Sequence, residues 1–186
     1  MKNEDHYRLC VEYIKKIDNA LYEHCRRTAE YAYGIAEQLH KDKKLVYKAG
    51  LVHDIGKIAT SPSILNNPKK LTAYERQIVD MHSYLGYCIL KNSHVNNDIC
   101  NIVLYHHGED KPHFEIDEVP REDVLYLAKI LRCADVFDAL RSERVYAQAI
   151  SAQKALDILY QSPELDRDIV DVMAAKMQKE SCLNAI

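Results

Sequence analysis

With 186 residues, the chain is long enough to bury a substantial hydrophobic core. A net charge of −3 excludes nucleic-acid binding through a broad basic surface, so no nucleic-acid duplex is expected as a partner. No apolar run approaches the ~18 residues of a membrane helix, and the six cysteines form no C-x-x-C pair. These features predict one reduced, cytoplasmic domain over residues 1–186, without membrane association.

Apolar residues in the first half of the chain recur at helical spacing. One stripe, at four-residue intervals, predicts an amphipathic first helix: Leu9, Tyr13, Ile17 and Leu21. A second stripe extends from Cys25 to Leu39 and predicts another helix. Pro62 and Pro68 then exclude a long helix between residues 58 and 71.

Helix resumes at residue 72, where Thr72 and Glu75 form a capping box in which each side chain binds the other residue's backbone N–H. Residues 108–120 are expected to form a loop, followed by a helix from about residue 121 to 138. The expected starts of the last two helices are Ser151, and Ser162 or Pro163. The pattern predicts an all-α fold, a bundle of about seven to nine helices without a sheet.

Histidine and aspartate side chains interrupt several apolar stripes. Their spacing places them on the inward faces of separate helices: His53, His82, His106, His107, Asp135 and Asp138. An ionised carboxylate that is buried without a partner destabilises the fold. A single buried histidine is more often a hydrogen-bonded core residue than a ligand, but one or two cations would satisfy all of these groups together. The pattern therefore predicts a metal centre.

His53 and Asp54 are adjacent, so on a helix their side chains point about 100° apart. Both reach one site only at the end of a helix, and Gly56 is expected to close that helix. From the centre of such a site, Asp54 could place one oxygen on each of two metal ions. Lys57 lies on the same side, where a cation is expected if an anionic substrate such as a phosphate lies between it and the metals.

Several motifs follow one another in a specific order. They comprise His24, the segment LVHDIGKI at 51–58, His82 with Gly86, the pair His106 and His107, and the segment ADVFDAL at 134–140 followed by Ser142, Arg144 and Tyr146. This ordered set, within a similarity that spans about residues 15 to 170, resembles the HD superfamily of phosphohydrolases. More narrowly, it resembles the HD-GYP branch, which is known for hydrolysing cyclic dinucleotides such as cyclic di-GMP.

The resemblance implies a role for each matching residue. The ligands of a first metal ion would be His24, His53, Asp54 and Asp135. The ligands of a second ion, bridged by Asp54, would be completed by His82, His106 and His107. Lys57 would contact the scissile phosphate, Arg144 would bind a phosphate of the substrate, and Asp138 would orient a neighbouring ligand. Iron or manganese suits such a histidine-rich, carboxylate-bridged set.

Four departures from the HD-GYP pattern concern the metals and the substrate. Ala20 replaces a glutamate that holds a third metal in some members, so two divalent ions are expected. The segment 108–118 replaces the signature Glu-x-x-Asp-Gly-x-Gly-Tyr-Pro and contains no Gly-Tyr-Pro. Ala147 stands where a second basic residue is usual, and the sequence holds no receiver or sensor domain beside the catalytic one.

The expected function is that of a metal-dependent phosphodiesterase acting on a cyclic dinucleotide. Two divalent ions about 3.5–4 Å apart would activate a water to hydroxide, which would attack the phosphorus in line. The altered loop keeps open a second candidate, an HD-family phosphohydrolase for another nucleotide or small phosphoester. The third candidate, a non-catalytic nucleotide-binding module, is disfavoured because the ligand set is complete. The sequence leaves open whether the chain assembles as a homodimer.

Overall fold

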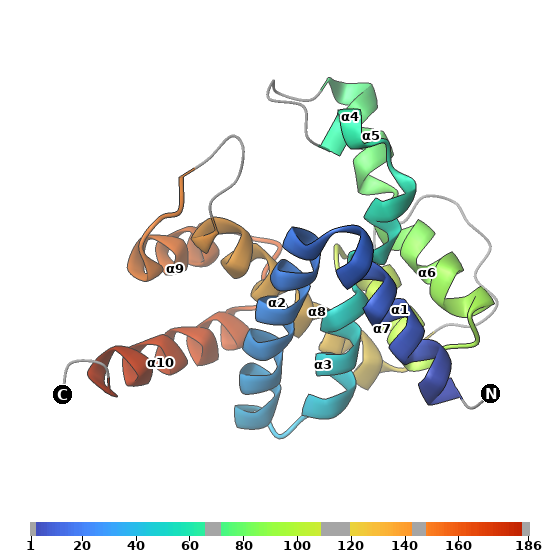
Figure 1. Ribbon diagram of the computed structural model, residues 1–186. Coiled ribbons are helices and arrows are strands. Elements are labelled where there is room, and N and C mark those ends of the chain that lie inside the picture. The colour runs from blue at the N-terminus through green and yellow to red at the C-terminus, as the bar shows by residue number, and fades with distance from the viewer. Residues whose placement is uncertain (1–2, 66–71, 109–119, 143–147, 184–186) are drawn as a thin grey trace.

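The computed structural model describes residues 3–65, 72–108, 120–142 and 148–183, and all regular elements in these ranges are helices (Figure 1). In chain order they are α1 (Asn3–Ile17), α2 (Asn19–Gln38), α3 (Lys43–Val52), the 3-10 helix η1 (Ile55–Ala59), α4 (Pro62–Leu65), α5 (Ala73–Asp80), α6 (His82–Asn92), α7 (Asn97–Tyr105), α8 (Glu122–Arg141), α9 (Ala152–Gln161) and α10 (Arg167–Leu183). The predicted all-α class is confirmed.

Helices α2 and α8 form the centre of the bundle. Helix α2 packs against both α3 and α8, and α7 contacts α3 and α8 in turn. The rings of Tyr31 on α2 and Phe137 on α8 meet edge to face, with 5.1 Å between their centroids. Ile35, Ile102 and Leu131 are completely buried in the same core, and burial of a side chain of this size stabilises a fold by about 1.5–3 kcal/mol. The helices that carry the predicted ligands are thereby held against one another.

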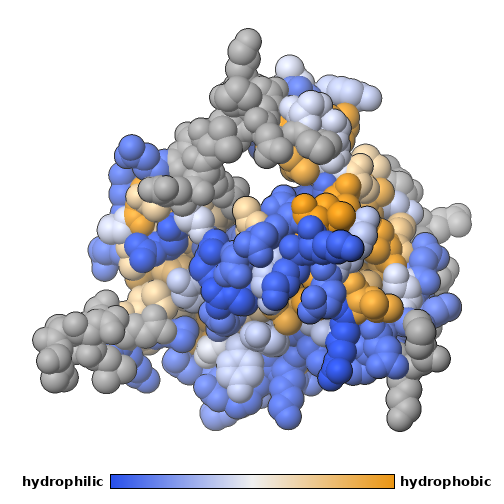
Figure 2. Space-filling view, viewed as in Figure 1, coloured by the Kyte–Doolittle hydropathy of each residue, from blue (hydrophilic) through white to orange (hydrophobic). Residues whose placement is uncertain are grey.

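Helix α1 buries a different face from the predicted one. Leu9, Tyr13 and Ile17 are 59%, 52% and 56% exposed, whereas Tyr7 and Ile14 pack into the core. The physical reason is that α1 carries two apolar stripes, and the one with spacings of three and four residues, formed by Tyr7, Cys10 and Ile14, faces the core. In Figure 2, apolar surface gathers around α1, while much of the remaining face in this view is hydrophilic.

The start signals of the later helices are partly confirmed. Thr72 and Glu75 form the predicted capping box at the start of α5, and the Ser151 hydroxyl accepts a hydrogen bond from the Lys154 N–H at the start of α9. The prediction that Ser162 or Pro163 opens the last helix is wrong. Ser162 ends α9, where its N–H binds the Leu159 carbonyl, and α10 begins only at Arg167.

The prediction that Gly56 closes a helix is also wrong. Helix α3 ends at Val52, and Gly56 lies inside η1, where it is buried. A Cβ atom at this position would lie 2.0 Å from the His82 carbonyl oxygen and 2.6 Å from the Gly86 nitrogen. Gly56 is therefore needed for close packing of η1 against the start of α6, and this packing brings His82 beside the segment of His53 and Asp54.

The outer helices are arranged around this centre. Helices α4 and α5 project from one end of the bundle, and α9 and α10 lie at the side opposite α6 (Figure 1). Within the described residues, no helix has both the length and the apolar character needed to cross a membrane.

Candidate metal centre

Five segments bring all seven predicted ligands into one site. His24 comes from α2, His53 and Asp54 from the junction between α3 and η1, His82 from the first residue of α6, and Asp135 from α8. His106 and His107 follow directly after α7. Three groups of side chains have ligand atoms that lie within 4.8 Å of one another: His82 with His106 and His107; His24 with His53 and Asp135; and Cys25 with His53 and Asp54.

Asp54 lies between the first two groups. Its Oδ2 is 3.5 Å from Nε2 of both His24 and His53, whereas its Oδ1 is 3.3 Å from Nε2 of His82. The carboxylate is almost completely buried, at 1% exposure. Burial alone would raise the pKa of Asp54, but Lys57 and the surrounding histidines hold it well below its usual range. Asp54 is therefore an anion with one oxygen directed to each half of the site.

Three histidines present the same ring nitrogen to the interior. Nδ1 of His53, His82 and His106 donates a hydrogen bond to the backbone carbonyl three residues earlier, over 2.8, 2.6 and 2.6 Å. A carbonyl can only accept, so Nδ1 carries a proton, and in the neutral form of each ring Nε2 keeps a lone pair directed into the site. The buried Nε2 atoms of His24, His53 and His106 have no hydrogen-bond partner. Ring nitrogens that converge in a buried space without hydrogen-bond partners fit the ligand set of a metal ion.

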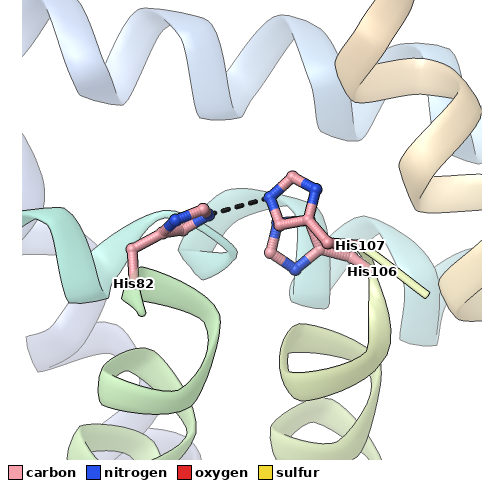
Figure 3. A group of neighbouring side chains, drawn as sticks. All are labelled: His82, His106 and His107. Atoms are coloured by element: carbon pink, nitrogen blue, oxygen red, sulfur yellow. Dashed lines mark hydrogen bonds between the residues drawn. The ribbon is translucent and has the colours of Figure 1, made fainter. Parts of the chain in front are cut away.

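The second group is drawn in Figure 3, where the rings of His82 and His107 approach each other beside His106. Nε2 of His107 is 3.0 Å from Nε2 of His82. His107 is exposed as a residue, but its ring faces into the site, and desolvation lowers its pKa to about 4. Burial also lowers the pKa of His82 and, more strongly, that of His106. This group is therefore neutral at pH 7, which is the form that binds metals.

The first group has the opposite electrostatic character. Burial opposes protonation of His24, but the neighbouring carboxylates of Asp135 and Asp138 raise its pKa overall. The pKa of His53 is raised well above its usual value, against burial, mainly by the charge of Asp54. Asp135 lies 3.0 Å from Nε2 of His24, and the two histidines hold its pKa well below the usual range despite burial. Without a metal, protons on these histidines balance the two carboxylates.

Asp138 orients His24 from outside the group. Its Oδ2 accepts a hydrogen bond from Nδ1 of His24 over 2.7 Å, which directs Nε2 toward Asp135. Arg27 donates to both oxygens of Asp138, over 2.8 and 3.0 Å, and Ser142 donates to Oδ2 over 3.1 Å. The apolar spacing of the sequence predicts that Asp138 points inward, but no sequence feature indicates that Arg27 is its partner.

Lys57 and Cys25 complete the surroundings of the site. The Lys57 ammonium lies 2.5 Å from Oδ2 of Asp54, and the carboxylates keep its pKa raised despite burial. Cys25 is completely buried, and its thiol lies with His53 and Asp54. Cys25 begins the second apolar stripe of the sequence, and its position directly after His24 is the one sign in the sequence that it borders the site. Arg144 lies outside the described residues.

Comparison with known proteins now identifies the family. The family model of the HD domain matches residues 21–140, which include every predicted metal ligand. The chain belongs to the HD domain family. Solved structures agree with this fold: the HD domain of the phosphodiesterase PgpH from L. monocytogenes, in complex with cyclic-di-AMP, matches with a TM-score of 0.67 at 22% identity, over 91% of this chain and 95% of that one.

Curated relatives of this HD domain are longer proteins. The chain is 36% identical over 132 residues to the cyclic di-GMP phosphodiesterase response regulator RpfG of Xanthomonas campestris, covering 68% of this chain and 35% of that protein. It is 32% identical over 139 residues to the 3′3′-cGAMP-specific phosphodiesterase 3 of Vibrio cholerae, covering 73% and 30%. The chain thus spans about a third of the length of these relatives.

The bidentate contact of Arg27 predicts a measurable role in metal binding by this HD domain. Arg27→Ala should lower metal affinity about 10- to 100-fold, because Asp138 loses the cation that holds it against His24. Arg26→Ala is the matched control, since among the described residues Arg26 forms ion pairs with Glu23 and Glu30 of its own helix and with no ligand. Competition with a chromogenic chelator measures both affinities, and equal affinity in the two variants would contradict this role.

The lowered pKa values of the second group predict acid-sensitive stability of the metal-free HD domain. An unfolded histidine titrates near 6.5, whereas His107 in the folded protein titrates at about 4. Between these values the unfolded chain binds more protons, so the free energy of unfolding should fall as the pH decreases from about 6.5 to 4. The pKa values of His24 and His53 are raised on folding, so these two histidines change the free energy of unfolding above about pH 6.5, outside this range.

Urea unfolding at stepped pH measures this dependence, with His107→Asn as the comparison. In the variant, the free energy of unfolding should fall less steeply between about pH 6.5 and 4. An unchanged slope of this free energy against pH would show that His107 does not cause the loss of stability.

Proposed function

We propose that this HD domain is a metal-dependent phosphodiesterase that hydrolyses a cyclic dinucleotide. The observation that carries the proposal is the position of Asp54, with one oxygen directed to His24 and His53 and the other to His82. Two divalent ions, iron or manganese, would occupy the two groups, with Asp54 shared between them. The cyclic dinucleotide phosphodiesterases among the relatives support the substrate class.

Divalent ions at this site would supply an activated water and would neutralise the phosphate of the substrate. The protein's own residues position these components. Three backbone carbonyls and Asp138 fix the histidine rings, so the rings would lose little conformational freedom when a metal ion binds. Lys57, which pairs with Asp54 when no metal is bound, would be released from this anion and could contact a non-bridging oxygen of the phosphate.

A specific feature favours a second candidate function. The segment 108–118 has no Gly-Tyr-Pro, and its charge is acidic. A different substrate of the same chemistry, such as another nucleotide or a small phosphoester, would account for this change. Both candidates use the same ligands and differ only in the group attached to the phosphate.

The proposal is tested with protein purified without oxygen, so that iron is kept in its reduced form. Metal content is measured first, and cyclic di-GMP, 3′3′-cGAMP, cyclic di-AMP, mononucleotides and bis(p-nitrophenyl) phosphate are then offered as substrates. Hydrolysis of a cyclic dinucleotide is expected. A clear preference for a non-cyclic phosphoester would favour the second function, and tight nucleotide binding without metal or turnover would favour the non-catalytic module.

The proposed role of Arg144 gives a separate prediction. Arg144→Ala should raise KM for the dinucleotide about tenfold or more while metal content stays unchanged, because a charge-assisted contact to the phosphate is lost. Arg8→Ala, an exposed arginine on α1, is the control. Steady-state kinetics combined with metal analysis separate the outcomes, and parallel loss of metal and activity would make Arg144 a structural residue instead.

A further inference from the structure

A pocket of about 320 Å³ adjoins the candidate metal centre. His107 belongs to both, since its ring meets His82 and His106 while the residue also lines the pocket. Leu125, Lys129 and Arg132 line one wall from successive turns of α8, and Asp135 follows one turn later. A molecule bound at the metal centre could therefore extend into this space, which we call the side pocket.

The side pocket is lined by charges that are not paired with one another. Among the described residues, Lys129, Arg132 and Glu164 form no hydrogen bond or ion pair, although all three face the same space. Asp166 also lines the pocket, but its Oδ1 already accepts the N–H of Asp168 over 3.1 Å. With respect to the described residues, the pocket thus offers unpaired donors on one wall and an unpaired carboxylate on the other.

The backbone next to His107 makes room for the Arg132 guanidinium. Gly108 has a φ of +110°, and a Cβ atom there would lie 3.0 Å from Nη1 of Arg132. Because glycine has no Cβ, the planar guanidinium can lie directly beside the chain that carries His107. Tyr105, Leu125 and Leu165 supply apolar surface around it. A flat ligand with polar edges fits such a lining.

We propose that the side pocket binds a guanine base of the dinucleotide substrate, an inference that rests on the proposed function. The Arg132 fork would donate to O6 and N7 of guanine, which is the commonest arginine–base pairing. The Glu164 carboxylate would accept the N1–H and N2–H donors on the adjacent edge. Adenine has an amino group in place of O6 and an acceptor at N1, so it would oppose both contacts.

The test separates base recognition from catalysis. Binding of cyclic di-GMP and cyclic di-AMP to metal-free protein is measured by calorimetry, and turnover of bis(p-nitrophenyl) phosphate by manganese-loaded protein reports the metal centre alone. The wild type should bind cyclic di-GMP about tenfold or more tightly than cyclic di-AMP. Arg132→Ala and Arg132→Lys should both reduce this ratio to near one, because lysine keeps the charge but lacks the fork.

Two further variants complete the design. Glu164→Gln should shift the preference toward cyclic di-AMP, since an amide can donate to N1 of adenine, and Arg8→Ala should leave the ratio unchanged. All four variants should keep turnover of bis(p-nitrophenyl) phosphate. Equal binding of both dinucleotides by the wild type, or an unchanged ratio in Arg132→Ala, would overturn the guanine site. Guanine-selective binding without any turnover would instead overturn the proposed function and leave the guanine site standing.

Discussion

Replacing Asp54 with alanine should abolish the proposed phosphodiesterase activity and metal binding by both halves of the candidate centre. The variant loses the one carboxylate that lies within 3.5 Å of Nε2 atoms in both groups, His24 and His53 on one side and His82 on the other. The fold should survive, because apolar contacts such as that of Tyr31 with Phe137 hold α2 against α8 without this side chain. Metal analysis and circular dichroism of the same preparation check the two statements together.

The matched control for this prediction is Asp80→Ala, which removes an exposed carboxylate from α5. It should keep full metal content and turnover. Two metal ions per chain in Asp54→Ala, together with retained turnover, would show that Asp54 does not bridge the two groups. Loss of helical signal in that variant would show instead that the pairing of Asp54 with Lys57 and the histidines is essential to the fold.

Replacing Gly56 with alanine should destabilise the protein by about 3 kcal/mol and weaken the three-histidine group. The new methyl group would lie 2.0 Å from the His82 carbonyl, so η1 and α6 must move apart. His82 is the first residue of α6 and would be displaced from Asp54 by the same movement. Chemical denaturation gives the stability, and metal titration gives the effect on the site.

Gly34→Ala is a close control for this substitution. The nearest described atoms to a Cβ atom at residue 34 belong to the end of the flexible Lys176 side chain, at 2.9 Å. This variant should therefore be near wild type in stability, or slightly more stable, because alanine favours helix over glycine. If both alanine variants were equally stable, the contact between Gly56 and α6 would not be the constraint that we infer.

The inward positions of several candidate ligands were accessible from sequence because these residues break a local apolar pattern, whereas His24 was indicated only by the resemblance to the HD superfamily. His82 and Asp135 stand where apolar residues are expected, so periodicity alone indicates that they point inward. The structure brings these residues together with the others, as the ordered motifs led us to expect. Local periodicity indicates which side of a helix faces the core, and this is enough to predict that residues such as His82 and Asp135 point inward.

Contacts between distant segments were not accessible in the same way. Arg27 and Asp138 are 111 positions apart, and nothing near either residue in the sequence indicates that they pair. The role of Gly56 likewise depends on a backbone carbonyl of another helix, and the apolar stripe of α1 could not reveal that the neighbouring face is the buried one. These features arise from the docking of helices, which a single sequence does not encode locally.

The hydrogen bonds of His53, His82 and His106 to carbonyls three residues earlier have a consequence for how the protein acquires its metals. Each ring is oriented by its own stretch of backbone, so ligand geometry is established when the chain folds and not when an ion arrives. A divalent ion could then bind and exchange at a preformed site without refolding of the chain. Under the proposed function, the metal that a cell supplies, and the rate at which it is replaced, would set how many molecules are active at a given time.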